Sequence, residues 1–144
     1  MDVSTAIKQR ISTRAFLDTP LPEADVRQWL IDAQRSPAGG NLQPWRVIAL
    51  AGDAKQAVVD LAAAKLAENP RGEPTDYPIY PDYISEAQNT RRRAVGEAMY
   101  GKIGIPRDDK MGRMMWFARN YQFFNAPLAL FIIMDERVGH GQWG

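Results

Sequence analysis

The chain has 144 residues, 45% of them apolar, which is enough for one domain, residues 1–144, with a hydrophobic core. Its formal net charge of +1 gives no general attraction to nucleic acid or to an anionic membrane surface, so neither partner is expected. The chain has no cysteine, which excludes disulfides, thiolate metal sites and cysteine nucleophiles within it. No secretory signal is visible, and the longest apolar run, residues 126–134, is too short to span a bilayer, so a cytoplasmic location is expected.

The first segment combines a short helix with a polar stretch. The apolar pattern of residues 3–8 predicts a helix that ends near Arg10. If the chain from there to Phe16 is extended, Arg10, Ser12 and Arg14 point to one side. Two guanidinium groups and a hydroxyl on one edge suit a phosphate and its neighbouring hydroxyls. A solvated edge strand is the alternative, and without further context it is the favoured one.

A second helix is predicted, and a polar loop that contains two glycines follows it. Pro22 near the first helical position, followed by an apolar stripe with helical spacing, predicts a helix that ends at Ser36, before Pro37. In the loop of residues 36–45, Gly39 and Gly40 allow a positive φ or a close approach to a ligand. Two side-chain amides, of Asn41 and Gln43, add donors and acceptors. A binding loop and an ordinary helix-to-strand connection remain equally supported.

The middle of the chain contains a strand, a helix and an irregular excursion. Residues 45–51 are apolar on both faces, which predicts a central strand, and Asp53 is expected to cap the helix that follows. In residues 69–83, four prolines exclude regular structure. We expect a lid or ordered excursion there, with three tyrosines as docking surface: Tyr77, Tyr80 and Tyr83.

Two more helices and a second strand follow. A helix begins after Ser85, and its run Arg91-Arg92-Arg93 is interpreted as a solvated face, since consecutive residues fan out around a helix. Asp108 or Asp109 is expected to cap the next helix, and residues 128–134 predict a fully buried strand. His140 is the only histidine and has no clustered partners, so no metal site is expected.

The count of elements indicates that more chain is needed to cover the sheet. About five helices and two strands are expected, and a two-stranded sheet that is apolar on both faces cannot stand alone in water. Either further strands come from a missing C-terminal part, or a partner chain supplies them. We expect the sequence to be incomplete at its C-terminus.

Three stretches together resemble the flavin-dependent nitroreductase family. They are Arg10-x-Ser12-x-Arg14-x-Phe16, the loop of residues 36–45, and residues 120–127 followed by a buried strand. The resemblance covers nearly the whole chain and implies an α+β fold, in which helices surround a mixed sheet. It further implies an intertwined homodimer with two FMN molecules at the interface, each held by both subunits. Family members continue beyond the second strand, so part of the cofactor site is expected to lie outside this chain.

The resemblance assigns two groups of residues to the cofactor. The first would hold the FMN phosphate and ribityl chain from one subunit: Arg10, Ser12 and Arg14. The second would meet the flavin from the other subunit: Pro37, Ala38 and Gly39, with Asn41 nearby. Many relatives carry serine where this chain has alanine and glycine, so contacts from the loop are expected to come from its backbone.

The implied chemistry belongs to the flavin, and no catalytic side chain is assigned. NAD(P)H would pass hydride to the flavin, and a nitroaromatic or quinone-like acceptor would then take it, by a ping-pong mechanism. Arg14 would stabilise negative charge on the reduced flavin. Two alternatives stay open for the parent protein: a relative with another flavin-based reductive or flavin-modifying reaction, and a non-catalytic flavin-binding or interaction subunit.

Overall fold

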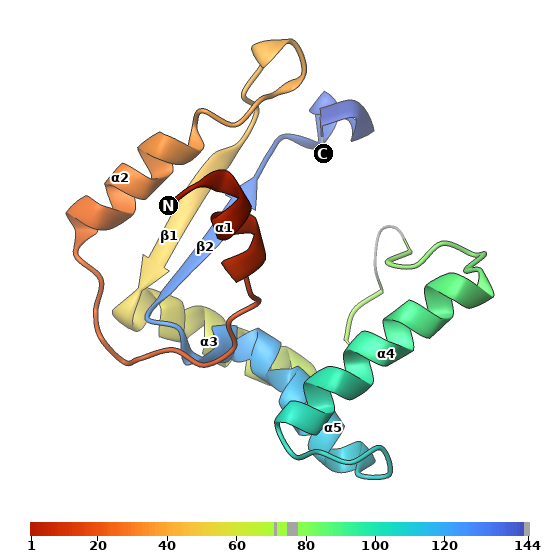
Figure 1. The fold of residues 1–144 in the computed structure, drawn as a ribbon. Coiled ribbons are helices and arrows are strands. Elements are labelled where there is room, and N and C mark those ends of the chain that lie inside the picture. The colour runs from red at the N-terminus through yellow and green to blue at the C-terminus, as the bar shows by residue number, and fades with distance from the viewer. Residues whose placement is uncertain (71, 75–77, 143–144) are drawn as a thin grey trace. The chain divides into compact units, whose positions relative to one another are not determined.

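The computed structural model describes residues 1–70, 72–74 and 78–142. It divides into two compact units, residues 1–58 with 123–144, and residues 59–122. Five α-helices and two strands are present among the described residues, as predicted (Figure 1). The elements are α1 (Val3–Gln9), α2 (Glu23–Ala33), β1 (Arg46–Ala51), α3 (Gly52–Glu68), α4 (Glu86–Lys102), α5 (Lys110–Ala118) and β2 (Leu128–Ile133).

The sheet of the first unit consists of β1 and β2, which pair antiparallel. Arg46 lies opposite Ile133 at one end, and Ala51 lies opposite Leu128 at the other. Helix α2 runs beside this sheet (Figure 1). Among the described residues of this unit, two are buried, Val26 of α2 at 8% exposure and Ala129 of β2 at 5%.

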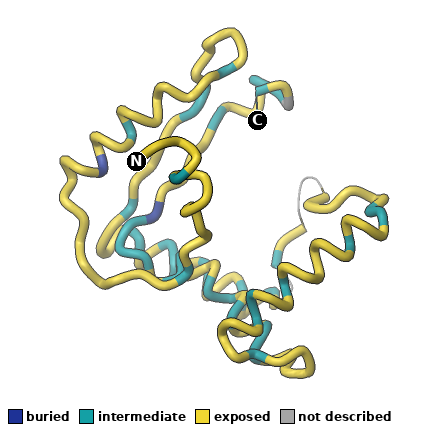
Figure 2. Tube along the Cα trace, in the orientation of Figure 1, coloured by how far each residue is buried: buried dark blue, intermediate teal, exposed yellow. Residues whose placement is uncertain are grey.

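The prediction that both strands are buried on both faces is wrong for this chain. Val47, Leu130 and Ile132 are 37%, 47% and 69% exposed, and most of the described chain is exposed in the same way (Figure 2). Within the described ranges each strand has one strand neighbour, so both are edge strands instead of central ones. The apolar pattern is that of a covered sheet, but the described elements leave much of its surface uncovered.

One capping prediction is confirmed, and the other two helix starts differ from the predictions. Asp109 caps α5 by accepting a hydrogen bond from the backbone N–H of Gly112 at 2.8 Å. Pro22 is the N-cap of α2 and so precedes the first helical position. Asp53 lies inside the first turn of α3, because that helix already begins at Gly52, so the predicted cap is wrong.

Helix α2 ends at Ala33, before the predicted Ser36. The residues between them form a turn in which the backbone N–H of Ser36 donates to the carbonyl of Ala33 at 3.0 Å. The proline at 37 disfavours the α-region for the residue before it, so the last turn tightens and the helix stops early.

In the second unit, Arg113 joins α4 to α5. Arg113 donates two hydrogen bonds of 2.8 Å to the carboxylate of Glu97 and one of 3.1 Å to the carbonyl of Pro106. Its guanidinium carbon also lies 4.2 Å from the ring centroid of Tyr100. This bidentate pair lowers the pKa of Glu97 below its ordinary value, chiefly through the hydrogen bonds from the guanidinium.

The irregular stretch and the arginine run both lie in the second unit. The described residues of 69–83 contain no helix or strand, as predicted, and Tyr77 lies outside the described residues. Arg91, Arg92 and Arg93 are all exposed on α4, which confirms a solvated helix face. That residues 69–83 form a lid, and that residues 1–144 form one domain, stay predictions.

Candidate functional site

The loop between α2 and β1 contains four residues with unusual backbone geometry or packing. Ala38 is extended, and a tight turn follows, in which the N–H of Asn41 donates to the carbonyl of Ala38 at 2.8 Å. Gly40, Asn41 and Gln43 have φ values of +59°, +55° and +46°. This left-handed backbone is open to glycine, and asparagine tolerates it better than most other residues. The prediction of a positive φ is therefore confirmed at Gly40.

Gly39 serves a different purpose, because its φ is not positive. A Cβ at this residue would lie 2.6 Å from Nε2 of Gln142, closer than side-chain atoms approach one another. A side chain at residue 39 would therefore require the end of the Gln142 side chain to move. The close approach to a ligand that the sequence predicts at this glycine stays a prediction.

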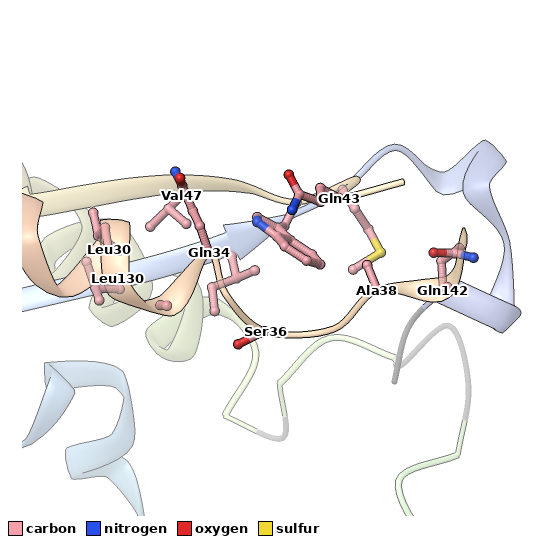
Figure 3. Close-up of a pocket in the computed structure, with 13 residues that line it drawn as sticks. Leu30, Gln34, Ser36, Ala38, Gln43, Val47, Leu130 and Gln142 are labelled. Atoms are coloured by element: carbon pink, nitrogen blue, oxygen red, sulfur yellow. The ribbon is translucent and has the colours of Figure 1, made fainter. Parts of the chain in front are cut away.

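The loop forms one end of a cavity of about 740 Å³ within the first unit. This volume lies in the range of about 300–1,000 Å³ that is usual for small-molecule sites. Leu30, Val47 and Leu130 lie toward one end and Ala38 and Gln142 at the other (Figure 3). The complete lining combines an apolar floor with three amide side chains: Leu30, Ala33, Gln34, Ser36, Ala38, Gly39, Gln43, Trp45, Val47, Leu130, Ile132, Met134 and Gln142.

The first group of predicted residues, Arg10, Ser12 and Arg14, follows α1 and does not line this cavity. Arg10 is the C-cap residue of α1, and it and Ser12 are exposed. The segment that follows is neither helix nor strand, so it is not the edge strand considered as the alternative. Arg14 is half-buried, and its Nη1 donates to the carbonyl of Ser12 at 3.2 Å.

The structure thus brings two of the seven predicted cofactor residues, Ala38 and Gly39, into the cavity wall. Pro37 and Asn41 flank them in the chain, and Arg10, Ser12 and Arg14 lie elsewhere in the same unit. Sequence reasoning missed Gln34 and Gln142 as lining residues. A glutamine in a glycine-rich tail carries no local signal, so its place beside the loop is decided by tertiary packing alone.

Of the three tyrosines in the irregular stretch, Tyr80 and Tyr83 are described, and both belong to the second unit. The guanidinium carbon of Arg92 lies 4.9 Å from the ring centroid of Tyr80, and Tyr83 is 79% exposed. Within the described part of the chain, no group of three or more His, Asp and Glu side chains could hold a metal ion. None of the described helices has the length and apolar character needed to cross a membrane.

Comparison with known proteins places these residues in a family. The model of the nitroreductase family matches residues 7–143. Nitrobenzene nitroreductase of Ectopseudomonas oleovorans is 32% identical over 136 residues, which are 94% of this chain and 60% of that protein. Chloronitrobenzene nitroreductase of Comamonas testosteroni is also 32% identical over 136 residues, with the same coverage of 94% and 60%. The chain thus spans 60% of the length of these curated relatives.

A solved structure agrees with the sequence comparisons. The FMN and NADPH-dependent nitroreductase NfnB from Sphigopyxis sp. strain HMH is 41% identical to this chain and superposes with a TM-score of 0.92. The match covers 99% of this chain and 64% of that one. It confirms the predicted α+β fold class, and with the family model it leads to one conclusion. The chain belongs to the nitroreductase family.

Proposed function

We propose that the complete gene product is an FMN-dependent oxidoreductase that uses NAD(P)H to reduce nitroaromatic or quinone-like acceptors. The observation that carries this proposal is the match to the nitroreductase family over residues 7–143, which includes both groups of predicted cofactor residues. The relatives named above act on nitroaromatic compounds by their names, and the similar structure is described as FMN and NADPH-dependent.

The side chains after α1 fit the phosphate end of FMN. Arg10 and Ser12 are exposed, so neither needs to leave a packed position to meet a ligand. A guanidinium donates paired hydrogen bonds to phosphate, and a hydroxyl can donate to or accept from a ribityl hydroxyl. We assign Arg10 to the phosphate, Ser12 to the ribityl chain and Arg14 to the pyrimidine edge of the flavin.

The loop of residues 36–45 fits the flavin ring through its backbone. Ala38 and Gly39 have almost no side chain, so a flat ring can approach the peptide groups of Pro37, Ala38 and Gly39 closely. Asn41, held in a left-handed conformation at φ +55°, adds an amide at the same place. Ser36 supplies a hydroxyl at the start of the loop and lines the cavity.

The chain's own residues would hold the flavin and shape its surroundings, and none of them acts as an acid–base pair. When bound, FMN supplies hydride transfer, from NAD(P)H to the acceptor, in two separate half-reactions of a ping-pong scheme. Arg14 provides a fixed positive charge for the negative charge that develops on reduction. The cavity has an exposed apolar floor near the loop. Once this floor is covered, it keeps water away from one side of the site.

We also propose that the two groups meet across a homodimer in the cytoplasm. The exposed strands support this assembly, because Val47, Leu130 and Ile132 leave an apolar surface that another chain segment or subunit would cover. Within one chain, Arg10, Ser12 and Arg14 do not line the cavity. This separation also supports the homodimer, because the two groups of one subunit can then belong to two different FMN sites.

Flavin binding tests the enzyme proposal directly. The purified complete gene product should be yellow or become so with added FMN. Without oxygen, it should oxidise NAD(P)H beyond one equivalent per flavin only when a nitroaromatic or quinone is present. A preparation that stays colourless with FMN contradicts the enzyme proposal. Flavin binding without NAD(P)H oxidation favours a non-catalytic flavin-binding protein instead.

Mixed dimers test whether each site is shared. Arg10→Ala impairs one group, and Gly40→Val impairs the other, since valine does not tolerate the φ of +59°. If each site takes one group from each subunit, a heterodimer of the two variants contains one intact site and one doubly impaired site. We expect it to bind one FMN per dimer with the parent affinity. Weak binding at both sites would contradict the shared arrangement.

A further inference from the structure

We propose that Phe124 is a positioning residue that holds the guanidinium of Arg14 for the flavin, an inference that rests on the function proposed above. The guanidinium carbon of Arg14 lies 5.8 Å from the ring centroid of Phe124. A cation within about 6 Å of a ring face is attracted by the negative potential of that face. With the hydrogen bond from Nη1 to the carbonyl of Ser12, the head of this side chain is held at two points.

The ring of Phe124 stands on an unusual stretch of backbone. Phe123, Phe124 and Asn125 have φ values of +51°, +52° and +60°, three consecutive left-handed residues with side chains. Such a conformation is unfavourable for residues with a Cβ and persists only where neighbouring contacts hold it. A strained turn directly before β2 is therefore a place where a function is expected.

The contacts that hold this turn are visible on both sides. The Phe123 ring packs edge-on against Phe131 of β2, with centroids 5.7 Å apart and an interplanar angle of 82°. After the turn, the carbonyl of Ala126 accepts a hydrogen bond of 2.6 Å from Nζ of Lys55 on α3. The turn is thus attached to β2 and α3, and the Phe124 ring lies against Arg14 of the segment that follows α1.

The attachment matters because an arginine side chain has many rotamers. Loss of the ring would weaken the hold on the Arg14 head beside Ser12, and the flavin would have to order more of this side chain on binding. With the ring, part of that ordering is complete before the ligand arrives. Phe124 acts on the flavin through Arg14 and makes no assigned contact with it.

A double-mutant cycle measures this dependence. FMN dissociation constants are determined by fluorescence quenching for the complete gene product, Arg14→Ala, Phe124→Leu and the double variant. We expect Phe124→Leu to weaken binding about two- to fivefold, as for loss of a partly exposed cation–π contact, and to add nothing in the Arg14→Ala background. Equal weakening in both backgrounds would overturn the proposal. Phe117→Leu, at a ring that is 60% exposed on α5, is the matched control and should leave the constant unchanged.

A second variant keeps the test decisive if Phe124→Leu does not fold. Replacing Phe124 by 3,5-difluorophenylalanine keeps the ring's shape. The fluorine atoms reduce the negative electrostatic potential of the ring face, which attracts the cation. FMN binding should weaken in this variant, and unchanged binding would overturn the inference. If the unsubstituted protein binds no FMN, the proposed function fails and takes this inference with it. If the unsubstituted protein binds FMN normally but the substitutions at Phe124 and Arg14 show no coupling, this inference is overturned and the proposed function is not.

Discussion

The segment after α1 and the loop between α2 and β1 are built in opposite ways, although both belong to the proposed flavin site. The first carries its chemistry on side chains, because Arg10, Ser12 and Arg14 supply two charges and a hydroxyl on irregular backbone. The second carries little side-chain chemistry and much backbone geometry, with a left-handed Gly40 and a glycine at 39 that admits Gln142.

The difference indicates how each region should respond to substitution. A site made of side chains loses affinity when a single charge is removed, and the fold is hardly affected because exposed residues contribute little to stability. A site made of backbone loses affinity when its conformation is strained, and stability falls with it. Substitutions in the two segments therefore distinguish a site made of side chains from one made of backbone.

Arg10→Ala should weaken FMN binding about tenfold to a hundredfold, the loss that accompanies a hydrogen bond to a charged group. The slope of affinity against salt concentration should fall as well, because one phosphate contact is gone. Fluorescence titration at several salt concentrations measures both. Arg27→Ala, which removes an exposed arginine paired with Glu23, is the control and should leave affinity unchanged. Flavin retention equal to that of the parent in the Arg10 variant would count against the assignment.

Gly40→Ala should lower both stability and FMN affinity. An alanine at φ +59° costs about 1–2 kcal/mol, since the left-handed region is unfavourable for residues with a Cβ. Urea unfolding measures the change. Gly96→Ala is the same substitution inside α4, where a Cβ meets nothing within 4 Å, and it should raise stability by about 0.5–1 kcal/mol. Equal effects at the two glycines would mean that the loop conformation carries no special cost.

Ser12→Ala should weaken FMN binding about two- to tenfold, the range for one neutral hydrogen bond. The salt dependence should stay as in the parent protein, because no charge is removed. This separates the hydroxyl from the guanidinium of Arg10 in the same segment. Ser4→Ala, an exposed serine in α1, is the control, and an effect of Ser12→Ala no larger than that control would contradict the assignment.

Acidification should loosen α1, the helix that ends at Arg10. Hydrogen bonds from the backbone N–H and the hydroxyl of Thr5, at 2.9 and 2.8 Å, lower the pKa of Asp2 below its ordinary value of 3.8. Because the pKa of Asp2 is lower in the folded chain, the ionised cap stabilises α1 at pH values above the pKa of Asp2 in the unfolded chain. This stabilisation is lost as the pH falls through the lower pKa of the folded chain. Amide chemical shifts of α1 between pH 6 and pH 2 should show the loss.

Asp2→Asn is the comparison for that titration. Its amide oxygen can still cap the helix but does not titrate in this range, so the pH dependence of the α1 amides should disappear. A titration that persists in Asp2→Asn would mean that another group controls the helix. The effect is the smallest of the four predicted effects, since the carboxylate is exposed to solvent.

Much of the secondary structure could be predicted because its signals are local. The capping aspartate at 109, the proline that ends α2 and the two apolar strands all lie within a few residues of the structure that they determine. The error at the cap of α3 is local too. The start of α3 at Gly52 lies one residue ahead of the expected cap, because this glycine adopts φ +52° and turns the chain directly from β1.

The candidate site was predictable only where its residues lie close together in the chain. The arginines after α1 and the glycine loop are short motifs, and the order of three such motifs pointed to the family that the comparisons then showed. Gln142 against Gly39 and Phe124 beneath Arg14 join residues far apart in sequence. No period or spacing connects such pairs.

The sequence by itself determined the helices, the strands, the loop with its left-handed glycine and the family. These depend on local backbone preferences and on short motifs, which any stretch of chain carries with it. Tertiary structure alone decided that the apolar strands stay exposed in this chain, and that a strained turn before β2 meets an arginine from the first segment. Burial and long-range contacts depend on which surfaces meet when the chain folds, and local sequence patterns do not reveal that.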